Sequence, residues 1–116
     1  MRHVMTMAVG LALLASLGAQ TMEQRKVITA GPTPIGPYSP AVAAGELIYV
    51  SGLLGTGDDG KLVGPDVASQ TRKILDRMGE ILAAADTSLA RTVSVSVFLK
   101  NAADFGAMND AYRTYF

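Results

Sequence analysis

The chain has 116 residues, 49% of them hydrophobic, and its ten basic and ten acidic residues leave a net charge of zero. This length favours a single domain, and the balanced charge provides no basic surplus for binding nucleic acid. The absence of cysteine excludes disulfides, thiolate metal sites and a cysteine nucleophile. The one histidine, His3, lies near the N-terminus, so we expect neither a histidine metal cluster nor a Ser-His triad.

Residues 1–20 have the pattern of a secretory signal peptide. Arg2 and His3 precede an apolar stretch over residues 4–17, and small residues follow around Gly18. The stretch ends too soon for a membrane-spanning helix, so we expect no span. This leader predicts an exported, periplasmic protein. The alternative is a cytoplasmic protein whose translation starts at Met22.

Three short strands are predicted next, over residues 25–30, 41–44 and 47–51. Gly45-Glu46 separates the last two, and glycine in the first position of a two-residue connection favours a type II′ hairpin. Residues 55–60 form a glycine-rich loop that contains Asp58-Asp59. Adjacent carboxylates in such a loop are usually solvated turn residues, so we expect no metal there.

The loop between the first two predicted strands holds one tyrosine between two prolines. Residues 35–40 read Ile-Gly-Pro-Tyr-Ser-Pro, and Pro37 and Pro40 disfavour helix at the residues before them. The segment is therefore stiff and presents Tyr38 in a fixed direction. Two interpretations remain open at this point: Tyr38 packs over the edge of the core, or it belongs to a binding site.

A long amphipathic helix is the strongest periodic signal. Its apolar face recurs at helical spacing, and Asp66 is a good N-cap for it. Gly79 is a defect inside this helix that costs about 1 kcal/mol relative to alanine. The residues of the apolar face are Val67, Thr71, Ile74, Leu75, Met78, Ile81, Leu82 and Ala85.

Residues 92–99 alternate between apolar and polar positions, which predicts a half-buried strand. A strand, a helix and a strand in that order form a right-handed crossover, so we expect this strand to lie parallel to the one at 47–51. A second helix is predicted from about Ala103, with an apolar face of Phe105, Met108, Tyr112 and Tyr115/Phe116. Asn109 lies within that face, where it either ties down a neighbouring backbone group or borders a pocket.

Two motifs stand out together, Ile-Gly-Pro-Tyr-Ser-Pro at 35–40 and Tyr-Val-Ser-Gly at 49–52. With the segments 66–68, 97–100 and 104–109 running into Tyr112 and Phe116, they resemble the RidA/YjgF family of small trimeric enamine/imine deaminases. The resemblance covers residues 25–116, which we take as one domain behind the leader. It implies an α+β, chorismate-mutase-like fold. That fold is a sheet with two helices on one face, in the order β-β-β-α-β-α within this chain.

The resemblance also implies the function and the site. Family members of this type hydrolyse reactive enamines and imines to 2-oxo acids and ammonia, without a cofactor, in homotrimers with a ligand pocket at each subunit interface. By resemblance, Tyr38 lines the pocket, the Ser51-Gly52 backbone approaches the substrate, and Asn109 borders the pocket. A missing Cβ at Gly52 would let a ligand come close to the main chain.

The family's catalytic residues have no counterpart in this chain. The arginine that clamps the substrate carboxylate and the glutamate that orients the water would both lie beyond Phe116. We therefore expect a C-terminally truncated chain that is inactive alone, with no catalytic residue of its own. The alternatives are a non-catalytic ligand-binding or chaperone-like relative and, less favoured by the neutral charge and the absence of a suitable histidine, a ribonuclease or translation inhibitor. Arg72, Arg91 and Arg113 are expected to be solvated.

Overall fold

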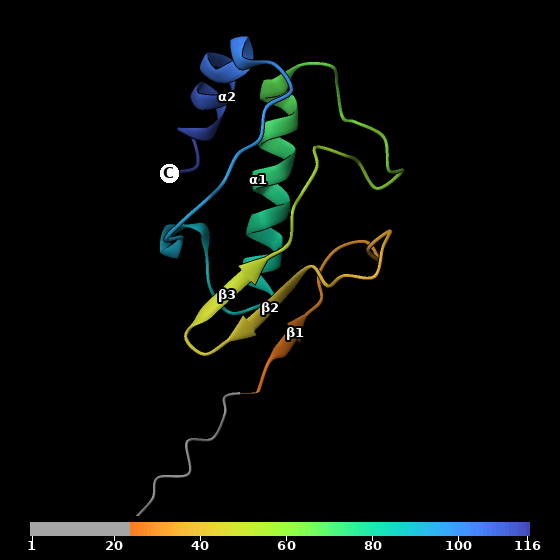
Figure 1. The fold of residues 1–116 in the computed structure, drawn as a ribbon, viewed down its shortest axis with the longest axis vertical. Coiled ribbons are helices and arrows are strands. Elements are labelled where there is room, and N and C mark those ends of the chain that lie inside the picture. The colour runs from red at the N-terminus through yellow and green to blue at the C-terminus, as the bar shows by residue number, and fades with distance from the viewer. Residues whose placement is uncertain (1–23) are drawn as a thin grey trace, which may run out of the picture.

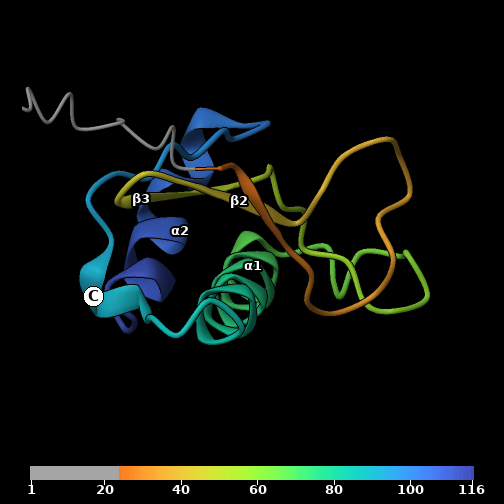
Figure 2. The same cartoon turned by 90° about the horizontal axis from the view of Figure 1, so that it is seen from below.

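The computed structural model describes residues 24–116, so the leader predicted at residues 1–20 lies outside the described part. A three-stranded antiparallel sheet in the order β1-β2-β3 is covered on one face by two helices, α1 and α2 (Figures 1 and 2). The strands are β1 (Lys26–Ile28), β2 (Ala41–Ala44) and β3 (Leu47–Val50), and the helices are α1 (Val67–Ala83) and α2 (Phe105–Tyr112). No helix within 24–116 is both long and apolar enough to cross a bilayer.

The hairpin of β2 and β3 forms as predicted. Ala44 pairs with Leu47, and Gly45 between them has a φ of 60°, whereas Glu46 is not among the residues of positive φ. This combination is that of a type II′ turn, in which only the first central residue needs a positive φ. The register also aligns Val27, Val42 and Tyr49 across the three strands. Their strand neighbours Ile28, Ala41 and Val50 pack in the core. Because side chains alternate along a strand, Val27, Val42 and Tyr49 lie on the sheet face away from the helices.

Helix α1 begins and packs as its sequence pattern predicts. The Asp66 carboxylate accepts a hydrogen bond from the Ser69 backbone N–H at 2.7 Å, which satisfies one of the unpaired donors at the helix start. This hydrogen bond also holds the pKa of Asp66 below its usual value. The predicted apolar face is the buried one, with its most enclosed residues being Thr71, Leu75, Ile81 and Leu82.

The core lies between the sheet and the C-terminal half of α1. Ile28 of β1, Ala41 of β2 and Ile81 of α1 form its centre, each at most 6% exposed. Ala30, Ala43, Ile48, Val50, Leu53 and Ala85 pack around that centre. This small core fixes where the ends of β1 and β3 lie, and both ends lead into the loops that form the candidate site.

The prediction of a paired strand at residues 92–99 is wrong for this structure. The segment joins no ladder, and it runs past α1 in Figure 1 rather than along β3. A strand is stabilised by the hydrogen bonds and side-chain packing of its neighbours, and here Val93 is 85% exposed and Phe98 94% exposed. The alternation was real, but the chain described here supplies no partner for it, so the expected parallel pairing with β3 does not form.

The second helix is confirmed, but its buried face differs in part from the prediction. A 3₁₀ turn (Ala102–Asp104) leads into α2, and Met108 and Ala111 are its buried residues. Phe105 and Phe116, both predicted on the apolar face, are at least half exposed. The Tyr115 hydroxyl donates to the Asp76 carboxylate at 2.8 Å, which ties the end of the chain to α1. Burial in that contact, together with the carboxylate, raises the pKa of Tyr115.

Candidate functional site

Three of the four predicted site residues surround one hollow. Tyr38, Ser51 and Gly52 line an open space of 400 Å³. They reach it from two segments that are distant in sequence, the loop between β1 and β2 and the residues directly after β3. Both loops that follow β1 and β3 extend from the same side of the molecule in Figures 1 and 2. The hollow is large enough for a small organic substrate.

Tyr38 is presented by a tight turn. Its backbone N–H donates to the Gly36 carbonyl at 2.8 Å, which closes a three-residue turn centred on Pro37. The fixed φ of proline suits the central position of an inverse γ-turn. Tyr38 is half exposed and makes no side-chain hydrogen bond among residues 24–116. Packing over the core edge, the first of the two interpretations, therefore does not explain the exposed half of the Tyr38 side chain.

Ser51 fastens the tyrosine loop to the end of β3. Its hydroxyl donates to the Ser39 carbonyl at 2.5 Å, and its backbone N–H donates to the Pro40 carbonyl at 3.0 Å. These two hydrogen bonds hold both residues that follow Tyr38. The Ser51 side chain thus has a structural partner of its own, and what it offers a ligand is its main chain.

Gly52 leaves the main chain open toward solvent. A Cβ built at this position meets no heavy atom within 4 Å. Since Gly52 also lines the hollow, the missing side chain is not required by packing. It leaves space where a ligand can approach the backbone.

Asn109 does not line this hollow in the single chain. It is half-buried on α2, and its side chain takes part in none of the hydrogen bonds found among residues 24–116. The simpler interpretation, an amide tying down a neighbouring backbone group, is therefore not what the structure contains. Its role at a pocket stays a prediction.

The described part of the site contains no charged side chain. Arg72, Arg91 and Arg113 are exposed, as predicted from the sequence. Asp58, predicted to be a solvated turn residue, is 79% exposed in its side chain, yet pairs with Arg77 at 2.9 Å. Within residues 24–116 no three histidine, cysteine, aspartate or glutamate side chains gather into a metal site. The hollow therefore offers a hydroxyl, main-chain groups and shape.

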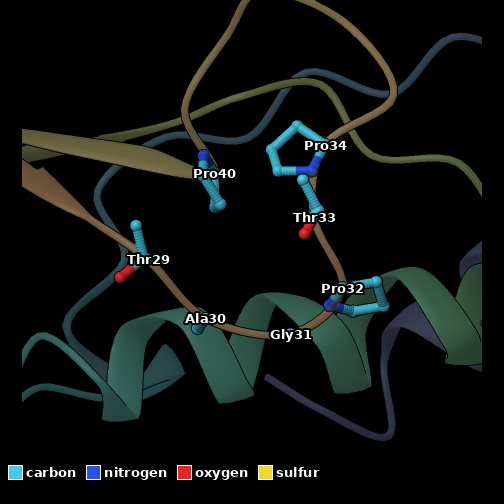
Figure 3. Close-up of a pocket in the computed structure, with 7 residues that line it drawn as sticks. All are labelled: Thr29, Ala30, Gly31, Pro32, Thr33, Pro34 and Pro40. Carbon is cyan, nitrogen blue, oxygen red and sulfur yellow. The ribbon is translucent and has the colours of Figure 1, made fainter.

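A second hollow lies beside the start of the same loop. It measures 190 Å³ and is enclosed by the chain between the end of β1 and the start of β2 (Figure 3). Its lining carries threonine hydroxyls but no charged group, and proline rings form much of it. Its lining residues are Thr29, Ala30, Gly31, Pro32, Thr33, Pro34 and Pro40. We assign it no chemical role.

Gly36, the residue against which the Tyr38 ring lies, was not identified from the sequence. A Cβ at Gly36 would lie 3.1 Å from Cε1 and 3.2 Å from Cδ1 of the Tyr38 ring. Gly36 stands directly before Pro37 in the segment that the sequence singled out, but nothing in its pattern shows that the ring folds back over it. That contact depends on the side-chain direction of Tyr38.

Comparisons with known proteins show which family this chain is similar to. The family model described as Endoribonuclease L-PSP matches residues 28–116. A 2-iminobutanoate/2-iminopropanoate deaminase of Mus musculus is 42% identical over 95 residues, which cover 79% of this chain and 70% of the mouse protein. The chloroplastic Reactive Intermediate Deaminase A of Arabidopsis thaliana is 37% identical over 103 residues, and these span 87% of this chain but 55% of that protein.

A solved structure supports the same assignment. The crystal structure of the YjgF gene product from E. coli has a TM-score of 0.72 and 34% sequence identity, and the match covers 78% of this chain and 73% of that one. The α+β, YjgF-like fold is thus confirmed, and the chain belongs to the RidA/YjgF family.

Proposed function

We propose that the full-length protein is an enamine/imine deaminase, which hydrolyses reactive 2-imino acids to 2-oxo acids and ammonia. The observation that supports this most is the gathering of Tyr38, Ser51 and Gly52 around one open hollow. The resemblance to the RidA/YjgF family assigns these three residues to the family's pocket. The similarity to the mouse protein named as such a deaminase points the same way.

The chemistry needs a proton donor, an anchor for the substrate carboxylate and a positioned water. The enamine takes a proton on its β-carbon to become the imine, water adds to the imine carbon, and ammonia leaves with the carbonyl formed. In the described chain, Tyr38 offers a hydroxyl and Ser51-Gly52 offer main-chain groups. The arginine anchor and the water-orienting glutamate are proposed to follow Phe116.

We further propose that the working form is a homotrimer. The sheet face away from the helices carries Val27 and Tyr49, which are 44% and 60% exposed, in register with Val42 between them. Phe98 and Phe105 are also exposed, and a stable monomer rarely leaves this much apolar surface in water. In a trimer with interfacial pockets, Asn109 of a neighbouring copy would border the hollow that Asn109 of the same chain does not reach.

The enzyme proposal is tested with the complete open reading frame. The purified protein is incubated with 2-aminoacrylate generated in situ, and ammonia and 2-oxo acid are measured against the uncatalysed background. Tyr38→Phe is the matched variant, because it keeps the ring and removes only the hydroxyl. Release no faster than background from the folded wild-type protein would refute the deaminase assignment.

A second candidate is a non-catalytic protein that binds a small ligand. It is favoured by one observation, that none of the three residues around the hollow is charged. Without a bidentate arginine, a pocket loses its carboxylate recognition. A Pro-x-Arg motif and a late glutamate encoded after Phe116 would favour catalysis, and their absence would favour binding. The balance of ten basic and ten acidic residues gives no support for a ribonuclease.

We also propose export, on the pattern of residues 1–20. Cell fractionation of the protein with and without these residues tests this. Export predicts a periplasmic wild-type protein and a cytoplasmic shortened one. A wild-type protein that stays in the cytoplasm would instead favour a start at Met22.

A further inference from the structure

We propose that Gly36 is a positioning residue, which sets the direction of the Tyr38 ring over the hollow. This inference rests on the proposed function for its consequence in catalysis, but its structural part stands on contacts within the chain. Gly36 does not line the hollow itself. It acts through the tyrosine two residues later.

The first step of the argument is the contact between the two residues. A Cβ at Gly36 would stand 3.1 Å and 3.2 Å from two carbons on one edge of the Tyr38 ring. Carbon atoms in contact prefer about 3.5–4.0 Å. The ring edge therefore rests over the Cα of Gly36, in a place that is available only because this residue has no side chain.

The second step is the turn that brings the ring there. The hydrogen bond from the Tyr38 N–H to the Gly36 carbonyl folds the backbone back on itself around Pro37. From the other side, Ser51 holds the carbonyl of Ser39. The backbone on both sides of Tyr38 is thus fixed, so the Tyr38 side chain can change direction only by rotating about its own bonds. The contact with Gly36 limits that rotation.

The third step separates this role from a role in folding. The φ of Gly36 is not in the left-handed region, so an alanine can adopt the same backbone conformation. Tyr38 is half exposed, so its ring has room to swing away from an added methyl group. Alanine at this position should consequently displace the ring by a few tenths of an ångström and leave the fold intact.

A small displacement of this kind matters for catalysis because proton transfer depends on near-contact geometry. We expect Gly36→Ala to lower kcat/KM about tenfold, since misplacing a reacting group by about 1 Å can cost about a hundredfold. In a Tyr38→Phe background the same change should cost less than about twofold, because the hydroxyl that Gly36 places is already absent.

The matched control is Gly106→Ala. A Cβ at Gly106, on the exposed surface of α2, meets no atom within 4 Å. Neither variant should lower the unfolding midpoint, and Gly106→Ala should raise it slightly because alanine is the better helix former. Only Gly36→Ala should lose activity. An equal tenfold loss in the wild-type and Tyr38→Phe backgrounds would overturn the assignment, because Gly36 would then act on something other than Tyr38.

A readout that does not depend on activity completes the test. The tyrosines of the full-length protein, which include the four of this chain, are labelled with 3-fluorotyrosine, and the Tyr38 resonance is assigned by its loss in Tyr38→Phe. Gly36→Ala should shift this fluorine resonance, and Gly106→Ala should not. An unmoved resonance overturns the proposal even if activity falls. A shifted resonance in a protein without deaminase activity would confirm that Gly36 positions the Tyr38 ring and would refute the proposed function.

Discussion

The C-terminal end of α1 contains a residue that is poorly suited to its conformation. Asp86 has a φ of 57°, which places it in the left-handed region that side chains other than glycine rarely adopt. The Asp86 N–H donates to the Ala83 carbonyl, and the Thr87 N–H donates to the Leu82 carbonyl, both at 3.0 Å. This pair of hydrogen bonds is a Schellman motif, with Asp86 at the position that usually holds glycine.

Two costs arise from the aspartate, and both can be removed. The left-handed conformation costs an L-residue about 1–2 kcal/mol. Substitution by glycine removes this cost, but about 0.4–1 kcal/mol of the gain is lost again because glycine is more flexible in the unfolded chain. A carboxylate near a helix C-terminus adds about 0.3–1 kcal/mol, since the helix dipole is negative there. Asp86→Gly should therefore stabilise the protein by about 1 kcal/mol, or about 4–8 °C in Tm for a domain of this size.

A series of substitutions separates the two costs. Asp86→Asn removes the charge and keeps tolerance for the left-handed conformation, so it should give only the electrostatic part. Asp86→Ala removes the charge but tolerates the conformation least, so it should be no more stable than the wild type. Thermal unfolding of the full-length protein at one fixed concentration measures Tm for each form. We expect the highest Tm with glycine at position 86, the next with asparagine, and the lowest with the wild-type aspartate and with alanine. An alanine variant as stable as the glycine variant would refute the conformational argument.

Three further predictions concern α1 and the loop before it. Asp66→Ala should lower the urea midpoint at neutral pH, whereas Asp66→Asn keeps the cap. Because folding lowers the pKa of Asp66, the ionised carboxylate stabilises the fold fully above its unfolded-state pKa, and this stabilisation is lost as the pH falls through its folded-state pKa. A difference in midpoint between wild type and Asp66→Ala that does not change with pH would contradict this. Gly55→Ala should cost about 1–3 kcal/mol, since its Cβ would lie 2.6 Å from the Gln70 Cα on a helix that cannot move aside; an unchanged urea midpoint would show that the loop yields. Gly79→Ala should stabilise by about 0.5–1 kcal/mol, because its Cβ meets only a Leu89 methyl at 3.9 Å; calorimetry that shows a lower Tm would mean that this contact is too tight.

The features that were predictable from sequence are those decided by residues near one another in the chain. The hairpin at Gly45, the N-cap at Asp66 and the buried face of α1 each depend on a few neighbouring residues whose spacing is visible in the sequence. The segment containing Tyr38 was recognisable as stiff because two prolines restrict it regardless of the rest of the fold.

The features that were not predictable depend on what lies across from a segment. The alternation at residues 92–99 describes two faces but cannot say whether a partner strand is present, and in this structure none pairs with it. The same holds for Phe105, which is apolar and on the expected helix yet 61% exposed. For Asn109, the helix was predictable but the distance of this residue from Tyr38 was not, because that distance is a property of the whole fold.

The candidate site divides along the same line. Three contacts that hold Tyr38 come from within residues 36–51: the turn at Pro37, the surface of Gly36 and the hydrogen bond from Ser51 to Ser39. The proposed carboxylate anchor and the neighbouring Asn109 would come from other strands or other copies. Because the position of Tyr38 depends on neither of them, it is already fixed in the single chain, before the proposed anchor and the neighbouring Asn109 are added. In the proposed trimer, assembly would complete the site by adding charge to a surface whose shape is already fixed, which would lower the ordering cost that binding would otherwise carry.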